Sequence, residues 1–219
     1  MTQRKHTGRR SKLSVIISGM TSVGKTTAAN VIAKEFRLTH YAGGDMLKQM
    51  AIERGYKPAG SDWWDTPEGM RFLSERSANS DFDTEVDRRL VEKIKRGGVV
   101  VTSYPIPWIC KEGFKLWFKA SQKTRAKRLA GRDAIPLSSA LKIIRRRDTD
   151  NRKLYQKLYG IEFGRDLSVF NFEIDTNNIS ANEVARFSAE LVRDYERARD
   201  FYAKKSDFCP DELSFAKQL

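Results

Sequence analysis

The chain has 219 residues and a formal net charge of +13, from 41 lysines and arginines against 28 aspartates and glutamates. Its length and its 40% content of hydrophobic residues favour one large α/β domain over two small ones. The positive charge favours anionic partners, among which nucleotides and RNA both qualify.

The cysteines and the distribution of apolar residues exclude several classes of protein. Cys110 and Cys209 stand far apart without a CxxC pair, which argues against a disulfide framework or a zinc site and fits a reducing compartment. No apolar run approaches the roughly 20 residues of a membrane span, and the amino-terminal segment lacks a signal-peptide hydrophobic stretch. We therefore expect a soluble, cytoplasmic, monomeric protein that makes no membrane contact.

Residues 1–12 contain no acidic residue and almost nothing apolar, and their cations are Arg4, Lys5, Arg9, Arg10 and Lys12. A segment of this composition is expected to be disordered alone. It is either a solvated tail or an arm that contacts RNA or a ribosome. No linker follows it, so we expect one domain over residues 13–205 and a short tail over residues 206–219.

Residues 13–30, LSVIISGMTSVGKTTAAN, are predicted to form a strand, a phosphate-binding loop and a helix. Gly19, Gly24, Lys25 and Thr26 satisfy Gly-x-x-x-x-Gly-Lys-Ser/Thr, the Walker A motif. Glycine permits backbone angles that turn consecutive N–H groups toward phosphate oxygens. The lysine brings positive charge to the β- and γ-phosphates, and the threonine hydroxyl is the usual ligand for Mg²⁺. The residues expected to bind ATP are Gly19, Met20, Thr21, Ser22, Val23, Gly24, Lys25, Thr26 and Thr27.

The residues on either side of this loop fit a nucleotide site. Val15, Ile16 and Ile17 form a β-branched apolar run, which is typical of a central parallel strand covered on both faces. After the loop, apolar residues recur with helical spacing on one face, at Ala29, Ile32, Ala33 and Phe36. The loop is therefore expected between a buried strand and an amphipathic helix.

Further strands are predicted at residues 38–42, 99–101, 114–120 and 170–175. With the first strand they make a five-stranded parallel sheet, with helices on both faces in a three-layer α/β P-loop fold. In residues 114–120, FKLWFKA, polar and apolar residues alternate, which predicts one wetter face and a position nearer the sheet edge. Residues 102–105 are expected at the same end of the sheet as the phosphate loop, where open α/β sheets bind ligands.

The segment after the second strand is predicted to contain a helix and then a turn-rich stretch at residues 56–68 with Pro58, Gly60 and Pro67. Gly43-Gly44-Asp45 opens a helix that ends near Gly55, and Asp45 either caps this helix or places a carboxylate near an acceptor nucleotide. Trp63 and Trp64 cannot share one face, so at least one covers a groove or an interface; we favour packing in the core or under a lid over base stacking. Residues 83–95 and 182–195 have the apolar spacing of amphipathic helices.

Two consecutive helices carry a large share of the arginines. In the first, residues 121–132, one face carries Arg125, Arg128 and Arg132. The second begins at Pro136, and within it Asp148 and Arg152 have the spacing of an i,i+4 ion pair. We favour a lid over a solvated helix face, because phosphoryl transfer needs fixed positive charge where the transition state spreads negative charge over the phosphoryl oxygens.

The chain resembles the P-loop nucleoside monophosphate kinases, and most closely the short cytidylate kinases found in archaea and some bacteria. The resemblance covers nearly all of residues 13–195. It rests on the segments GMTSVGKTT, YAGGDMLK, DTEVDRRL, FKLWFKASQKTRAKRLAGRD, RRRDTDNRKLYQKLYGI and DLSVFNFEIDT. The Walker A motif alone identifies the superfamily, and the order and spacing of the other segments narrow it to this family.

This resemblance implies that the γ-phosphoryl group of ATP is transferred to the phosphate of CMP or dCMP. Lys25 and Thr26 would hold ATP and Mg²⁺. The acceptor would bind within residues 43–96, and the lid would lie within residues 121–155. The resemblance places Asp45, Lys48 and Arg88 at the acceptor, and Lys25 with Arg128, Arg132 and Arg147 at the transferred group.

Two positions depart from the family pattern. After the third strand these kinases usually have Gly-Arg-Leu, with the arginine on the acceptor, whereas this chain has Ser103-Tyr104-Pro105 and so places Tyr104 there. Lys48 stands where arginine is usual, which exchanges a bidentate fork for a point charge, and Arg88 or Arg89 could compensate. The departures keep two alternatives open: a kinase for a different acceptor, or a nucleotide-binding partner of RNA or the ribosome.

Overall fold

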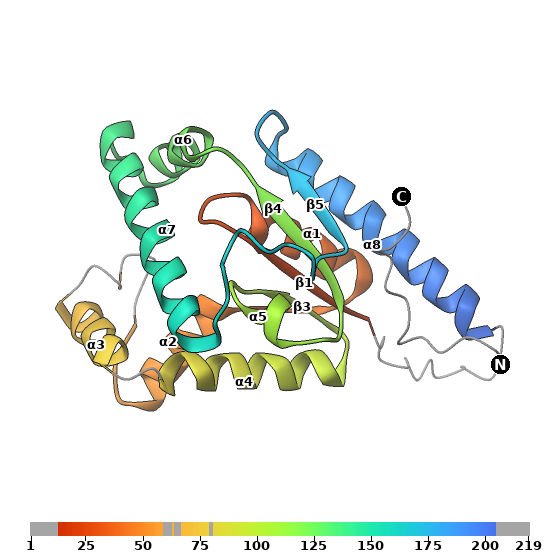
Figure 1. The fold of residues 1–219 in the computed structure, drawn as a ribbon, viewed down its shortest axis with the longest axis horizontal. Coiled ribbons are helices and arrows are strands. Elements are labelled where there is room, and N and C mark those ends of the chain that lie inside the picture. Colours follow the sequence, from red (N-terminus) through yellow and green to blue (C-terminus); the bar gives the residue numbers. More distant parts are fainter. Residues whose placement is uncertain (1–12, 59–62, 64–66, 79–80, 205–219) are drawn as a thin grey trace, which may run out of the picture.

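A computed structural model describes residues 13–58, 63, 67–78 and 81–204 of the chain. These residues form a five-stranded sheet in the order β2-β3-β1-β4-β5, in which neighbouring strands are parallel. Helices pack on both faces of this sheet (Figure 1). The predicted three-layer P-loop fold is confirmed.

The strands are β1 (Ser14–Gly19), β2 (Thr39–Ala42), β3 (Val99–Thr102), β4 (Phe114–Lys119) and β5 (Phe172–Asp175). All of β1 is buried, because β3 and β4 flank it and helices cover both of its faces. The register pairs Ser14 with Val99 and Ile17 with Thr102, so β1 and β3 end side by side. The residues that follow β3 therefore emerge next to the phosphate loop, as predicted.

The helices of the described residues are α1 (Lys25–Phe36), α2 (Gly43–Glu53), α3 (Pro67–Ala78), α4 (Asp81–Arg96), α5 (Ile106–Ile109), α6 (Gln122–Asp133), α7 (Leu137–Tyr159) and α8 (Ala181–Lys204). Val15 and Ile17 belong to a core shared with α1 and α8, whereas Ile16 belongs to a core shared with α2, α4 and α5. Neighbouring residues of β1 reach opposite cores because side chains alternate along a strand.

Helices α6 and α7 form a separate, smaller core from Ala126, Leu129, Ala140 and Ile144. The chain enters α6 just after the carboxyl end of β4, so this helical pair stands at the end of the sheet where the phosphate loop lies (Figure 1). The two predicted arginine-bearing helices are thus present, beside the loop.

For β4, the predicted position nearer the sheet edge is confirmed, because only β5 lies outside it, whereas the predicted wetter face is wrong. β4 lies between β1 and β5, and the edge strands of the sheet are β2 and β5. Lys115 and Trp117 are both buried. The Lys115 ammonium donates to the Pro107 carbonyl oxygen at 2.9 Å, and Trp117 packs among three other aromatic rings. The sequence of β4 alternates because Lys115 is a polar residue, but its ammonium has a buried backbone partner, and Trp117 is a core residue. The alternation therefore did not mark a face exposed to water.

Three helical features were not predicted. α3 and α5 were missed, and α8 continues to Lys204 instead of ending near residue 195. α3 buries Phe72, whose ring meets Tyr56, Trp63 and Phe82 from other parts of the chain. Because these contacts join Phe72 to residues outside α3, they leave little of the apolar spacing expected of a helix in its own sequence. Helix α5 has only four residues, which is too short for such spacing to appear.

Trp63 lies in the core between α2, α3 and α4, with 2% of its surface exposed. Its ring packs against Tyr56 and Phe72, and its indole N–H donates to a Glu68 carboxylate oxygen at 3.1 Å. This confirms core packing for one member of the tryptophan pair. The polar tip of the indole is satisfied, so the burial carries no unpaired donor.

Other predictions lie outside the described residues. They concern the basic arm at residues 1–12, Trp64, Cys209 and the tail at residues 206–219, and they stay predictions. Within the described part of the chain, no helix combines the length and the apolar character needed to cross a membrane.

Candidate active site

The loop between β1 and α1 has the backbone geometry of a phosphate-binding loop. Gly19, Ser22 and Gly24 have φ angles of 141°, 63° and 98°. A Cβ atom on Gly19 would lie 2.2 Å from the carbonyl oxygen of Phe118, so only glycine fits there. Left-handed residues turn successive N–H groups toward one concave side, and the start of α1 adds its positive dipole end.

Lys25 opens α1 and turns back over the loop. Its ammonium group donates to the carbonyl oxygens of Gly19 at 2.8 Å and Met20 at 2.7 Å. Burial lowers the pKa of Lys25, and nearby Tyr104 opposes this shift. Lys25 is therefore a partly desolvated cation that is held by two neutral carbonyl oxygens. An anion bound in the loop could take the place of these oxygens, and its hydrogen bond to the ammonium would be stronger because both groups are charged.

Two hydroxyl groups of the loop also suit phosphate and magnesium chemistry. The Ser22 Oγ is buried and has no hydrogen-bond partner among the described residues. Thr26, in the first turn of α1, is exposed. The described residues contain no group of three His, Cys, Asp or Glu side chains that could bind a metal ion. The loop fits a nucleotide whose Mg²⁺ keeps phosphate oxygens and water as ligands.

Tyr104, which follows β3, contacts the phosphate loop. Its hydroxyl lies 3.0 Å from the Thr21 Oγ1, and its backbone carbonyl accepts a hydrogen bond from the Ser18 hydroxyl at 2.8 Å. The Lys25 ammonium lies 4.8 Å from the centre of the Tyr104 ring. The structure thus brings Tyr104 to the phosphate loop.

Arg125 and Asp148 form a buried ion pair that joins α6 to α7. The guanidinium makes two hydrogen bonds to the carboxylate, at 2.9 and 2.7 Å, and each side chain is 3% exposed. Arg125 also donates to the Thr21 carbonyl oxygen at 3.4 Å. The expected pair of Asp148 with Arg152 is therefore wrong, and Arg125 anchors the helical pair to the loop instead of lining a lid surface.

The three arginines predicted at the transferred group lie in different surroundings. Arg128 donates to the Thr176 hydroxyl at 2.9 Å and to the Thr176 carbonyl oxygen, which ties α6 to the turn after β5. Arg132 pairs with its neighbour Asp133. Arg147 is exposed on α7, and its charge acts on the Tyr104 hydroxyl. The structure thus brings Arg147 close to the loop residues and holds Arg128 at the turn after β5.

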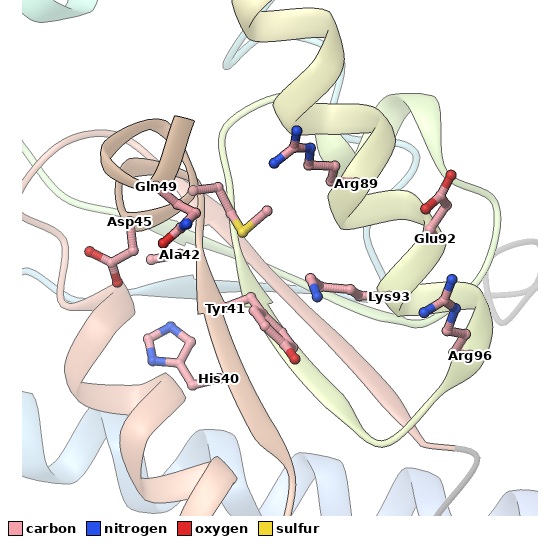
Figure 2. A pocket seen from close by; sticks show the side chains of 10 residues that line it. His40, Tyr41, Ala42, Asp45, Gln49, Arg89, Glu92, Lys93 and Arg96 are labelled. Atoms are coloured by element: carbon pink, nitrogen blue, oxygen red, sulfur yellow. The ribbon is translucent and has the colours of Figure 1, made fainter. Parts of the chain in front are cut away.

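The predicted acceptor residues do not all lie in one place. Asp45 lies in the first turn of α2, whose N-cap is Ala42, so its side chain does not cap the helix. It lines a groove of about 480 Å³ between β2, α2 and α4, with His40 and Tyr41 on one side and Arg89, Lys93 and Arg96 on the other (Figure 2). Lys48 is a partly buried residue of α2. Arg88 is exposed on α4 and pairs with Glu85 and Glu92, outside the groove lining.

A buried acidic pair on α4 was not predicted from the sequence. Arg76 of α3 makes a bidentate ion pair with Asp83, and the Tyr159 hydroxyl donates to Asp87 at 2.7 Å. Burial raises the pKa of Asp87 to about 7. Helical spacing could have revealed the pair, because both aspartates fall on the face of α4 that buries Leu90 and Ile94.

A parallel sheet with a glycine-rich, lysine-bearing loop after its central strand, covered by an arginine-bearing helical pair, defines a P-loop phosphotransferase. The AAA domain family matches residues 18–153 of the chain. The sequence is 32% identical over 180 residues to a cytidylate kinase of Pyrobaculum aerophilum, covering 81% of this chain and 91% of that protein. It is 34% identical over 187 residues to a cytidylate kinase of Pyrococcus abyssi, covering 84% and 97%. The chain belongs to the AAA domain family and is a P-loop nucleoside monophosphate kinase close to cytidylate kinase.

Solved structures resemble the fold at lower sequence identity. A shikimate kinase from Acinetobacter baumannii, solved with shikimate, aligns with a TM-score of 0.52 at 16% identity, over 84% of this chain and 94% of that one. A gluconokinase from Sinorhizobium meliloti aligns with a TM-score of 0.50 at 16% identity, over 88% and 98%. At such identity the likeness is one of fold.

Proposed function

We propose that the protein transfers the γ-phosphoryl group of ATP to CMP or dCMP, with Mg²⁺, and releases ADP and the nucleoside diphosphate. The observation that carries this proposal is the phosphate loop with Lys25 folded over it, in a chain that aligns along most of its length with cytidylate kinases. The names of these relatives support the choice of a cytidine nucleotide as acceptor.

On the donor side, the N–H groups of residues 19–27 would bind the phosphates of ATP. Lys25 would exchange the carbonyl oxygens of Gly19 and Met20 for the β- and γ-phosphates. The Ser22 hydroxyl would gain an acceptor in the same step. Thr26 would hold Mg²⁺, which supplies neutralisation of the phosphate charge.

On the lid side, α6 and α7 would supply positive charge at the transferred group. Arg147 is already near Tyr104 and would act directly, whereas Arg128 and Arg132 would have to exchange Thr176 and Asp133 for phosphate oxygens. No general base is required, because positioning and charge neutralisation carry most of phosphoryl transfer.

On the acceptor side, we assign Asp45 and Lys48 of α2, which starts where β2 ends at the carboxyl edge of the sheet. Lys48 would bind the acceptor phosphate as a point charge. Arg88 would first have to leave its ion pairs with Glu85 and Glu92, so we rank it behind Lys48.

The test is ADP formation from ATP and Mg²⁺ with CMP, dCMP, UMP, AMP or no acceptor. We expect strong stimulation by CMP or dCMP. The Lys25→Ala variant should lose at least about 100-fold in turnover while its fold is retained, since one charge-stabilising donor is typically worth that much. Lys123→Ala, an exposed lysine at the start of α6, serves as the matched control and should keep full activity.

Three results would contradict the proposal. Stimulation by UMP or AMP alone would keep the kinase and change its acceptor. ATP binding without stimulation by any monophosphate would favour the nucleotide-binding RNA or ribosome partner. Unchanged turnover in Lys25→Ala would remove the assigned phosphate loop from the mechanism.

A further inference from the structure

Tyr104 connects three parts of the molecule that must cooperate in phosphoryl transfer. Its hydroxyl meets Thr21 in the phosphate loop, and its carbonyl oxygen accepts from Ser18 at the end of β1. Its ring lies 6.0 Å from the ring of Tyr155 on α7 and 5.6 Å from that of Phe163, which follows α7. These contacts fix both the backbone and the ring, so the hydroxyl is held in one place.

The hydroxyl of Tyr104 lies in a positively charged environment. Burial opposes ionisation of the phenol, but the charge of Lys25, the hydrogen bond with Thr21, and Arg147 and Asn151 on α7 outweigh it, so the pKa of Tyr104 lies below its usual value. Surroundings that favour a phenolate equally favour the negative oxygens of a phosphoryl group.

The position of this hydroxyl relative to a bound nucleotide follows from Lys25. Walker A lysines reach the β- and γ-phosphates. The Lys25 ammonium lies against the face of the Tyr104 ring, and the hydroxyl at the tip of that ring contacts the middle of the loop. Tyr104 therefore lies beside the lysine that would reach these phosphates, on the side from which residues after β3 emerge.

We propose that the Tyr104 hydroxyl donates a hydrogen bond to the phosphoryl group in transit. The hydroxyl would exchange Thr21 for a phosphoryl oxygen and keep its proton throughout. The bond between the γ-phosphorus and the ADP oxygen breaks, and the bond to the acceptor oxygen forms. Arg147 supplies positive charge that tyrosine lacks.

This inference rests on the proposed phosphotransfer but not on the identity of the acceptor. It is tested with the full chain in two variants. Tyr104→Phe removes only the hydroxyl and keeps the ring contacts with Tyr155 and Phe163. Tyr195→Phe is the matched control, because that ring stacks on Phe114 at 4.4 Å in the core between β4 and α8.

The first measurement is binding of ADP with Mg²⁺, with and without aluminium fluoride, which imitates the phosphoryl group in transit. We expect Tyr104→Phe to weaken binding of the aluminium fluoride complex by about 10- to 100-fold, as for loss of one hydrogen bond to a charged group, and binding of ADP alone by less than about twofold. Tyr195→Phe should match the wild type in both.

Equal affinities of wild type and Tyr104→Phe for the aluminium fluoride complex would overturn the proposal, whichever acceptor the enzyme uses. An equal loss with ADP alone would also overturn it, because the hydroxyl would then only support the shape of the loop. Failure of the proposed acceptor is recognised separately, by the absence of CMP stimulation in the wild type.

The second measurement is turnover with the best monophosphate. Tyr104→Phe should lower kcat by a similar factor while the KM for ATP stays within about twofold, since a contact made only in the transition state acts on kcat. Tyr104→Arg again offers a hydrogen-bond donor and should recover more activity than Tyr104→Phe. A kcat for Tyr104→Phe equal to the wild type would contradict the assignment.

Discussion

The proposed donor and acceptor sides of the protein are built in different ways. On the donor side, nine consecutive residues, 19–27, form the site, and left-handed backbone at Gly19, Ser22 and Gly24 sets its shape. On the acceptor side, α2, α3 and α4 meet through aromatic packing around Phe72 and through ion pairs such as Arg76 with Asp83 and Arg89 with Glu53.

The two sides also differ in whether their cations are already paired with carboxylates. Lys25 is held by two neutral carbonyl oxygens and is available to an anion. Arg76, Arg88 and Arg89 on the acceptor side are each paired with carboxylates of the same region. A count of arginines therefore overestimates the cations available to an acceptor, while the phosphate loop is defined by its backbone.

The largest expected effect is on the anchor that holds the helical pair to the donor side. Asp148→Ala leaves Arg125 buried without its carboxylate, and should lower the free energy of unfolding by about 3–5 kcal/mol in urea titrations. Asp150→Ala is the control on the same helix, where an exposed pair with Arg146 is worth about 0–1 kcal/mol. Equal losses in the two variants would mean that burial of the Arg125–Asp148 pair adds nothing.

A pH titration tests the buried acidic pair on the acceptor side. Asp87 has a pKa of about 7 in the folded protein against 3.8 for an ordinary aspartate, so between these values the folded state binds more protons than the unfolded state. Stability should therefore fall as the pH rises from about 4 to 7, by about 2–4 kcal/mol. Asp87→Asn should remove this fall.

The control for this titration is Asp194→Asn, an exposed aspartate of α8 paired with Arg197. Its stability should follow the wild-type curve at every pH. A wild-type stability that stays constant or rises between pH 4 and 7 would show that Asp87 is ionised at little cost in the folded protein.

A smaller effect separates catalysis from binding at the lid. Arg128→Ala should lower kcat by about tenfold and ATP affinity by less, if the side chain leaves Thr176 to neutralise the transition state. Lys127→Ala, its exposed neighbour on α6, should change neither. A loss of ATP affinity with kcat preserved would show that Arg128 acts in the ground state and keeps its contact with the turn after β5.

The sequence was sufficient for the donor side because the features that build it are local. Val15, Ile16 and Ile17 predicted a strand covered on both faces, and the glycines and Lys25 predicted the loop. The order of the strands in the sheet could not be predicted from local patterns, because strand pairing joins residues that are distant in sequence. Likewise, the alternation in β4 could not show that Lys115 has a buried backbone partner, so one wetter face was expected there.

The contacts around Tyr104 and Arg125 could not be predicted from spacing. Helical periodicity placed Arg125, Arg128 and Arg132 on one face, but it could not show that Asp148 lies opposite Arg125 across two helices. Likewise, the departure at Tyr104 was visible, whereas its contact with Thr21 depends on β1 and β3 ending side by side. Both contacts join residues that are far apart in the sequence, so only the folded structure reveals them.

The central claim is that the phosphate loop delivers a phosphoryl group to a cytidine monophosphate. The most direct measurement follows the label from ATP carrying a radioactive γ-phosphate, incubated with the protein, Mg²⁺ and CMP. We expect the label to appear in CDP, with Lys25→Ala forming almost none. Label that remains in ATP or appears only as inorganic phosphate, in the presence of CMP and dCMP, would contradict the proposed reaction.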